Sequence, residues 1–256
     1  MTFSRLAARS GLLALAGALA IGAASPALAF DEAQTRDIEG IVRNYLVAHP
    51  EVLIEAMQAL ESKRTAQEDA ARRETIESSR KTLTATPEGT ALGAASGDVT
   101  LVEFFDYNCG YCKRAASDMD VLMDSDPKLR VVLKEIPVLG PASEAASRVS
   151  LAFRSVKPES YGAFQRKLLA SKTQVDEARA LQVAESFGVK PEVLKPLLQG
   201  QAVQAELQET GALAMALGIN GTPSYVVGDE LVAGAVGADA LAAKIGNVRQ
   251  CGKATC

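Results

Sequence analysis

Histidine is nearly absent from this sequence, and that absence removes one class of metal site. The chain of 256 residues has a single histidine, His49. A protein zinc site needs about four ligands, usually two Cys-x-x-Cys pairs or one pair joined by histidines. The chain has one such pair, Cys109-Gly-Tyr-Cys112, far downstream of His49. We therefore expect no zinc site, although two thiolates are enough to bind soft copper(I).

Two other features are missing: a basic stripe and, beyond residue 29, a long apolar run. The 27 lysines and arginines are outnumbered by 31 aspartates and glutamates, and the formal charge is −4. This mildly acidic balance is spread along the chain, so no nucleic-acid partner is expected. No later segment reaches the roughly eighteen consecutive apolar residues of a membrane-spanning helix.

The first 29 residues have the pattern of an export signal. Arg5 and Arg9 give a positive start, residues 11–24 are mostly apolar, and a small-x-small site ends at Ala29. We therefore expect a cleaved signal peptide over residues 1–29. An uncleaved anchor is the alternative, but the apolar run is short for a membrane span.

All four cysteines lie after this segment, in a chain that we expect to reach an oxidising compartment, where disulfides persist. Cys251 and Cys256 are separated by four residues that include Gly252. This spacing favours a small structural disulfide in the tail 251–256. A second redox or metal-binding pair is the alternative.

Glycine and proline are scarce between residues 31 and 83, where Gly40 and Pro50 are the only examples. Apolar residues recur at helical spacing on both sides of Pro50, which predicts two short amphipathic helices. They hold too few large apolar residues to fold alone, so they must pack on a domain or on copies of themselves. Residues 61–80 are charged on most faces, and a solvated helical spacer and a frayed linker fit them equally well.

The rest of the chain alternates between strand and helix patterns. Two mostly apolar runs of strand length flank a helical pattern that starts at Lys113, which predicts a right-handed βαβ unit with parallel strands. A helical block at about 142–217 follows, and then a hairpin and a closing helix. The predicted strands are Val99–Phe105, Leu129–Ile136, Ser224–Val227 and Glu230–Ala235, and the closing helix is Ala240–Val248. The pattern indicates an α/β domain with a helical insertion.

The Cys109–Cys112 pair lies between the first strand and its helix. Three interpretations fit such a pair: a dithiol redox centre, part of a metal site, or two unrelated core cysteines. A cysteine in the first turn of a helix is favoured as a thiolate, and a second cysteine three residues later shares its helix face. Glu103 is an anomaly within the preceding apolar strand, because a carboxylate there is either at an edge or buried with a task.

These residues carry a resemblance to a known family. The segment Glu103-Phe-Phe-Asp-Tyr-Asn-Cys-Gly-Tyr-Cys-Lys113, together with Gly221-Thr222-Pro223, resembles the active-site strand and cis-proline loop of the thioredoxin superfamily. The helical insertion resembles that of its DsbA-like members, and the likeness covers about residues 92–248. It implies a thioredoxin fold, activity as a thiol–disulfide oxidoreductase and cysteine-containing protein substrates.

The resemblance also implies roles for single residues. Cys109 corresponds to the exposed nucleophile and Cys112 to the buried resolving thiol. Pro223 corresponds to a cis proline facing the disulfide, and Thr222 to the residue whose backbone meets a bound substrate strand. We expect Tyr111 to shape substrate access, and no cofactor beyond the Cys109–Cys112 disulfide is implied.

The likeness further aligns Glu103 with the buried acid of the family, for which we expect a role in proton exchange with Cys112. It aligns Lys134 with a basic residue that pairs with that acid in DsbA. One departure is clear, because DsbA has a histidine between its cysteines where this chain has Gly110 and Tyr111. That histidine stabilises the reduced thiolate, so its absence argues against an extremely oxidising protein.

A second, shorter likeness concerns the N-terminal helices. Residues 38–61 are similar to the N-terminal region of the suppressor-of-copper-sensitivity protein C (ScsC) group, whose members can oligomerise there, some as trimers. The resemblance implies a homo-oligomer, either trimer or dimer, and a periplasmic location with a membrane redox partner. The predicted organisation is a signal peptide (1–29), a helical arm (30–83), a DsbA-like thioredoxin domain (84–250) and a tail (251–256).

Two functions remain in competition. The first is disulfide exchange with protein substrates, as an isomerase or an oxidase, and oligomerisation shifts the expectation toward isomerase or reductase. The second is copper(I) binding by Cys109 and Cys112 in an envelope stress protein.

Overall fold

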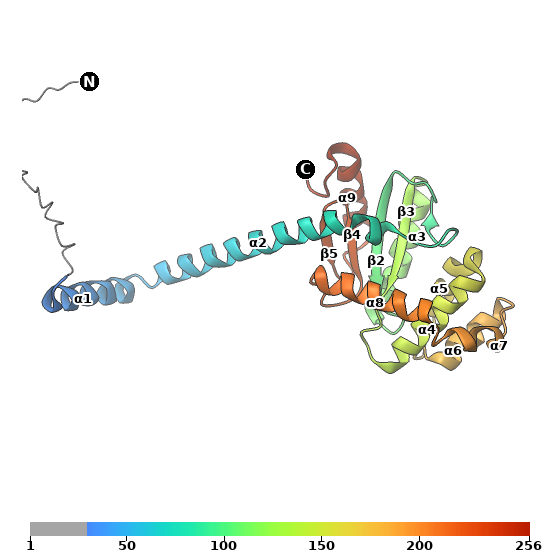
Figure 1. Cartoon of the computed structure of the whole chain (residues 1–256). Helices are drawn as coiled ribbons and strands as arrows, with labels where there is room; N and C mark the ends of the chain where they lie inside the picture. The colour runs from blue at the N-terminus through green and yellow to red at the C-terminus, as the bar shows by residue number, and fades with distance from the viewer. Residues whose placement is uncertain (1–29) are drawn as a thin grey trace, which may run out of the picture. The chain divides into compact units, whose positions relative to one another are not determined.

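The computed structural model describes residues 30–256 (Figure 1). The signal peptide expected over residues 1–29 lies outside the described residues. The chain divides into two compact units, one ending at Leu60 and one running from Glu61 to Cys256. In the described range, no helix is both long enough and apolar enough to cross a membrane.

The first unit holds helix α1 (Glu32–Ala48) and the start of helix α2 (Glu51–Thr84). A capping box starts α1: the Asp31 carboxylate accepts the Gln34 N–H at 2.8 Å, and the Gln34 side chain accepts the Asp31 N–H at 3.0 Å. The helix ends before Pro50, as expected. No residue of α1 is buried within the described chain, so its apolar side chains face outward.

Helix α2 runs without a break through the segment that was expected to be a solvated spacer or a linker. From Glu61 onward it belongs to the second unit, where Ile76 and Leu83 are each only 1% exposed and pack in one cluster with Val102 and Val226 of the sheet. The two residues are seven positions apart, which is two helical turns, and they share one face. The packed domain therefore starts before residue 84, where the sequence analysis began it.

The sheet of the second unit has five strands in the order β1-β3-β2-β4-β5. Strands β2 and β3 are parallel, and the other neighbouring pairs are antiparallel. The parallel pair confirms the predicted βαβ unit, whereas the two-residue β1 was not predicted. The strands are β1 (Leu92–Gly93), β2 (Val99–Phe105), β3 (Leu129–Glu135), β4 (Ser224–Val227) and β5 (Glu230–Ala233).

Helices cover both faces of this sheet. One face packs against α3, α9 and most of the insertion, and the other packs against the end of α8 and the end of α2. Side chains alternate between the faces along β2, so Leu101 and Phe105 enter the larger cluster while Val102 and Phe104 enter the smaller. The helices are α3 (Gly110–Ser125), α4 (Pro141–Val156), α5 (Tyr161–Leu169), α6 (Glu177–Ser186), α7 (Pro191–Leu194), α8 (Gln201–Ala216) and α9 (Ala238–Cys251), with 3₁₀ turns at Pro158–Ser160 and Lys195–Leu197.

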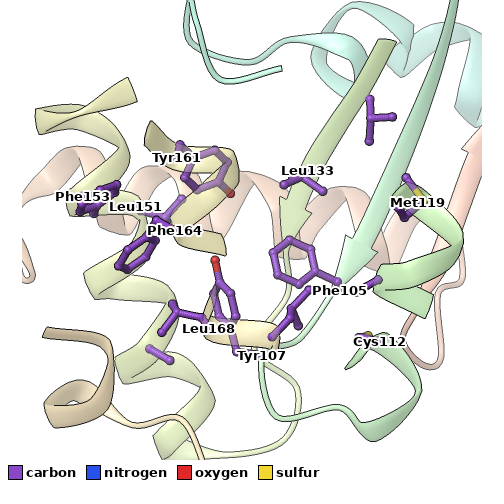
Figure 2. Packing of buried hydrophobic residues seen from close by; sticks show 14 of the residues in the cluster. Phe105, Tyr107, Cys112, Met119, Leu133, Leu151, Phe153, Tyr161, Phe164 and Leu168 are labelled. Carbon is purple, nitrogen blue, oxygen red and sulfur yellow. The ribbon is translucent and has the colours of Figure 1, made fainter. Parts of the chain in front are cut away.

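The insertion, α4 to α8, shares the larger cluster with the sheet. Phe153 of α4 and Phe164 of α5 stack with ring centroids 4.1 Å apart (Figure 2). Tyr107, just after β2, donates to Ser150 of α4 or accepts from it at 2.6 Å. The insertion is thus built into the core beside the end of β2, where the two cysteines lie.

Candidate active site

Cys109 is the N-cap residue of α3. Its backbone is extended (φ −73°, ψ 116°), and its Sγ accepts the Cys112 N–H at 3.4 Å. The same sulfur donates to the carbonyl oxygen of Thr222 at 3.1 Å. Unpaired N–H groups and the positive end of the helix dipole meet at this N-cap position. The sulfur that is expected to attack a disulfide therefore lies at the N-terminal end of a helix.

Cys112 lies one turn further along α3 and is fully buried, in the same cluster as Phe105 and Met119 (Figure 2). Burial raises the pKa of its thiol well above the usual value. Both cysteines are free thiols in this structure. Cys109 keeps 7% of its surface exposed, less than expected for an exposed nucleophile, because its sulfur turns toward Thr222. It is still the more accessible of the two.

The Thr222–Pro223 peptide bond is cis, and it brings the Thr222 carbonyl against Cys109. Beside it lies a groove of about 480 Å³ with a largely apolar wall. Tyr111 is 62% exposed at this groove, and the Arg114 guanidinium lies 4.2 Å from its ring centroid. The groove is lined by the cis-proline loop, by β5 and the residues after it, and by Arg72, Tyr111 and Ile219.

Glu103 is a buried acid on β2. It is 2% exposed, and its Oε1 has no hydrogen-bond partner among residues 30–256. Burial raises its pKa from 4.5 to about 8, and the charge of Arg166 opposes that rise. The acid therefore holds its proton near neutral pH. Among the described residues, Glu103 makes no direct hydrogen bond to Cys112, so the predicted proton exchange between them has no direct path in this structure.

The predicted pairing of Lys134 with Glu103 is wrong. Glu103 pairs in register with Leu133, and Lys134 pairs with Phe104, so the two side chains leave opposite faces of the sheet. Lys134 Nζ instead donates to the carbonyl of Ala85 at 3.1 Å. A shift of one residue in the alignment is enough to produce this error.

Tyr225 is a site residue that sequence reasoning missed. It pairs in register with Glu103 across β2 and β4 and is 1% exposed. Burial raises its pKa, and the nearby charges of Glu103 and Cys112 raise it further. Tyr225 is therefore within electrostatic range of both groups. The sequence signal that could have identified Tyr225 is its position two residues after Pro223, in the strand that follows the cis-proline loop.

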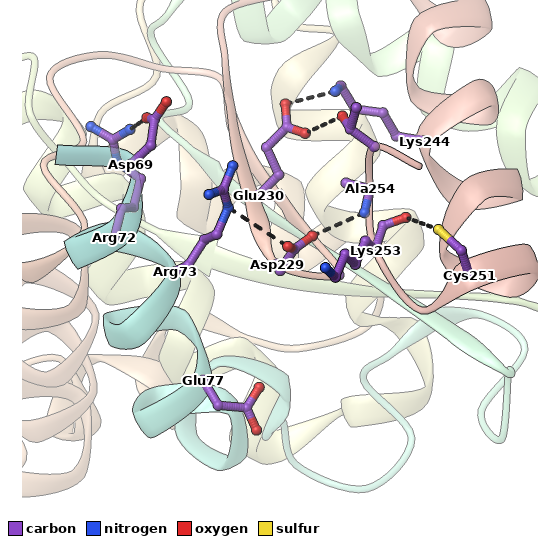
Figure 3. Close-up of polar contacts among 12 residues, drawn as sticks. Asp69, Arg72, Arg73, Glu77, Asp229, Glu230, Lys244, Cys251, Lys253 and Ala254 are labelled. Carbon is purple, nitrogen blue, oxygen red and sulfur yellow. Dashed lines mark hydrogen bonds and ion pairs between the residues drawn. The ribbon is translucent and has the colours of Figure 1, made fainter. Parts of the chain in front are cut away.

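Cys251 and Cys256 form a disulfide with an S–S distance of 2.15 Å. The loop that it closes packs on the β4–β5 turn: the Ala254 N–H donates to Asp229 at 3.0 Å, and Ala254 is fully buried (Figure 3). Arg73 of α2 lies 3.7 Å from the same carboxylate. The tail thus joins α9 to the β4–β5 turn, and the same turn is paired with α2 through Arg73.

The described residues contain no group of three or more histidine, cysteine, aspartate or glutamate side chains that could hold a metal ion. A two-thiolate copper(I) site would not be visible as such a group.

Comparisons with known proteins cover both parts of the chain. Residues 100–246 match the DSBA-like thioredoxin domain, and residues 34–67 match the N-terminal domain of the copper resistance protein ScsC. A thioredoxin-like oxidoreductase from Silicibacter pomeroyi DSS-3 is 40% identical, with a TM-score of 0.63 over 67% of this chain and 98% of its own.

Two further relatives are informative. Proteus mirabilis ScsC in a transitional conformation is 32% identical, with a TM-score of 0.61 over 86% of this chain and 96% of its own. Disulfide bond formation protein D of Bacillus subtilis (strain 168) is 27% identical in an alignment of 153 residues that covers 55% of this chain and 68% of that protein. With a cysteine pair at a helix N-terminus facing a cis-proline loop, the chain belongs to the DSBA-like thioredoxin domain family and is a thiol–disulfide oxidoreductase.

Proposed function

We propose that the protein exchanges disulfides with client proteins through Cys109 and Cys112, and that it acts as a disulfide isomerase. One observation carries the exchange chemistry: the Cys109 sulfur sits at a helix N-cap, 3.1 Å from the Thr222 carbonyl, with a buried partner thiol one turn away. This geometry places a nucleophile, a resolving thiol and a strand-like backbone edge at one point.

The reaction starts with one attack on the client and can then continue in two ways. The Cys109 thiolate attacks one sulfur of a client disulfide, which forms a mixed disulfide and releases the other client sulfur as a thiolate that takes up a proton. In an isomerase, that client thiol loses its proton and attacks a second client disulfide, which releases another client thiolate. This thiolate attacks the client sulfur of the mixed disulfide, so a new client disulfide forms and Cys109 leaves as a thiolate. In a reductase step, Cys112 loses its proton and attacks the Cys109 sulfur, so the Cys109–Cys112 disulfide forms and the client leaves reduced.

Glu103 is proposed to handle the proton of Cys112. Its raised pKa, about 8, lets it switch between acid and base near neutral pH. Its unpartnered Oε1 is free to bind a water that reaches the thiol. A Glu103→Gln protein should form the mixed disulfide at the normal rate but resolve it about ten to a hundred times more slowly. Rapid-quench detection of the mixed disulfide measures the two rates separately.

The exposed apolar side chains of the first unit support an oligomer. Ile41, Tyr45 and Val47 of α1 and Met57 of α2 are all more than half exposed. Such a concentration of exposed apolar residues on short helices is stable when a second copy covers it. Several active sites around one client would favour reshuffling of wrong pairings over simple oxidation, which is why isomerase is preferred to oxidase.

Refolding of scrambled ribonuclease tests this proposal, with the chain from Phe30 compared with a chain from Glu61. The shorter chain starts at the unit boundary and keeps Ile76 and Leu83, which a start near residue 83 would remove from the domain. We expect the longer chain to be oligomeric in sedimentation and to recover ribonuclease activity at least about fivefold faster. Equal rates from both chains would remove the arm from the mechanism.

Copper(I) binding by Cys109 and Cys112 is the second candidate. Two free thiols one helical turn apart support it, as does the likeness of residues 34–67 to a domain of a copper resistance protein. Titration of the reduced protein with a copper(I) chelator as competitor checks it, with a Cys109→Ser, Cys112→Ser protein as the control. The binding role would be supported if the wild-type protein took copper(I) from the chelator, the double serine variant did not, and the bound copper blocked disulfide exchange.

The setting proposed for this activity is the periplasm, reached through the cleaved signal peptide expected over residues 1–29. A solved relative from Salmonella enterica serovar Typhimurium is described as a periplasmic thioredoxin-like protein, and it is 28% identical. There the proposed partners are cysteine-containing client proteins and a membrane redox protein that restores the working form of the Cys109–Cys112 pair. Separation of the periplasmic fraction, followed by thiol trapping, tests both points.

A further inference from the structure

The residue just before the cysteine pair is tied to the helical insertion. The Asn108 amide bonds to both backbone groups of Val175: its Oδ1 accepts the Val175 N–H at 2.7 Å, and its Nδ2 donates to the Val175 carbonyl at 2.9 Å. Nδ2 also donates to Ser143 of α4 at 3.0 Å. One side chain thus pairs with a fully buried residue 67 positions away, as a strand would pair with its neighbour.

The residue just after the cysteine pair is tied to the same loop. Lys113 Nζ donates to the carbonyl of Ser171 at 2.8 Å and lies 3.4 Å from the carbonyl of Thr173. Burial lowers the pKa of Lys113, and the charge of Asp106 opposes that effect. The ammonium group is therefore held in place between carbonyl oxygens, unlike a freely solvated surface cation.

The loop that receives both residues, Ser171–Val175, connects α5 to α6. Asn108 and Lys113 hold its two ends, and the four residues between them form the active-site turn. We propose that Asn108 and Lys113 are positioning residues that fasten the Cys109–Cys112 turn to this loop and thereby set the equilibrium between its dithiol and disulfide forms. This inference rests on the proposed dithiol exchange.

The direction of the effect follows from the reduced geometry. In the dithiol form, the Cys109 sulfur needs an extended backbone at residue 109 to reach the Cys112 N–H. Asn108 fixes the residue before it, and the Lys113 ammonium, held at the carbonyl of Ser171, fixes the residue after Cys112. Both contacts hold the turn in the conformation of the dithiol form and therefore favour the reduced form. Loss of either residue shifts the equilibrium toward the disulfide.

Equilibration with glutathione measures this effect on the full chain from Phe30. The reaction is balanced: the protein dithiol and one glutathione disulfide give the protein disulfide and two glutathione thiols. We expect Lys113→Met to shift the equilibrium constant roughly tenfold toward the protein disulfide, and Asn108→Ala roughly three- to fivefold. Asn108→Ser is the second variant should Asn108→Ala fold poorly, since its short hydroxyl cannot reach both groups of Val175.

The double variant and a change at the neighbouring cation Arg114 distinguish attachment of the turn to the loop from a general effect of positive charge. If both residues act through one loop, Asn108→Ala, Lys113→Met should shift the constant no more than Lys113→Met alone. Lys113→Arg, which keeps a charged donor, should restore most of the effect. Arg114→Met removes the next cation, whose guanidinium lies over Tyr111, and should shift the constant less than about twofold.

Three results would overturn the inference. The first is equal shifts for Lys113→Met and Arg114→Met with none for the Asn108 variants, which would mean that charge alone acts. The second is strict additivity in the double variant. The third is an unchanged constant in every single variant that folds. A failure of the proposed function would look different, because the wild-type protein itself would then exchange with neither glutathione nor a client disulfide.

Discussion

The two cysteine pairs of this chain occupy opposite kinds of helix end. Cys109 and Cys112 lie at the start of α3, nearly or fully buried, and remain free thiols. Cys251 and Cys256 lie at and beyond the end of α9, are exposed, and are joined in a disulfide. The first pair therefore lies at the positive end of a helix dipole, and the second lies at the negative end.

This difference teaches that spacing alone does not define a redox centre. Both pairs are close enough in sequence to form a bond. Only the first faces a cis-proline loop, through Thr222, and is held to the insertion by Asn108 and Lys113. The second fastens buried Ala254 against the β4–β5 turn. The first pair is built to change its bonding, and the second to keep it.

The largest effect is expected from removal of the nucleophile. Cys109→Ser should lower the rate of insulin reduction by about a thousandfold or more, because a neutral hydroxyl does not attack a disulfide. The matched control is Cys251→Ser, Cys256→Ser, which should stay within about twofold of the wild-type rate at 25 °C. A comparable loss in the control protein would end the division of roles between the two pairs.

The different roles of the two cysteine pairs could be largely predicted from the sequence. They depend on the order of elements along the chain: a strand, the cysteines, a helix, and a Thr-Pro loop before a later strand. The long-range contacts that hold the Cys109–Cys112 site could not be predicted in this way. Asn108 meets Val175 across 67 positions, and no period or spacing signals a side chain that pairs with a distant backbone. Ile76 and Leu83 were missed for another reason, since two apolar residues in a charged helix look like a solvated spacer.

The second prediction concerns how the stability of the protein depends on pH, because a buried carboxyl group, Glu103, lies near the first cysteine pair and has no counterpart near the second among residues 30–256. The Glu103 pKa rises from 4.5 to about 8 in the folded protein, so the native state binds more protons than the unfolded state between these values. The free energy of unfolding must therefore fall as the pH rises through that window. Glu103→Gln removes this loss and should be more stable than wild type by a few kcal/mol at pH 9, but by much less at pH 5.

Urea unfolding at a series of pH values measures this difference. Glu135 provides an internal reference, because burial raises its pKa to about 7 in wild type and variant alike, and its contribution cancels. The control change near the second pair is Glu230→Gln, which removes a partly exposed carboxylate paired with Lys244 and should change the stability by no more than about 1 kcal/mol. A constant difference between Glu103→Gln and wild type from pH 5 to pH 9 would contradict the assignment.

The third prediction concerns the exposed pair. Replacement of Cys251 and Cys256 by serine opens a loop of six residues, which should lower the free energy of unfolding by about 2 kcal/mol on the chain-entropy estimate. The exchange rate should not change, and hydrogen exchange should rise at Ala254 and at the β4–β5 turn. Cys112→Ser is the comparison, since it should impair resolution of the mixed disulfide. Unaltered stability in the serine pair would mean that the contact of Ala254 with Asp229 alone holds the tail.

The smallest effect is expected from the residues between the cysteines. Tyr111 is 62% exposed and contacts Arg114, whereas Ala254, between the other two cysteines, is fully buried. Tyr111→Ala should change the stability by less than about 0.5 kcal/mol and slow exchange with a peptide disulfide about two- to fivefold, because one wall of the groove is lost. Exchange with glutathione, which is too small to fill the groove, should be unchanged. Ala254→Leu should show the reverse, with a loss of stability from overpacking and normal exchange. If Tyr111→Ala slowed both substrates equally, Tyr111 would act on the Cys109–Cys112 turn itself and not on client access.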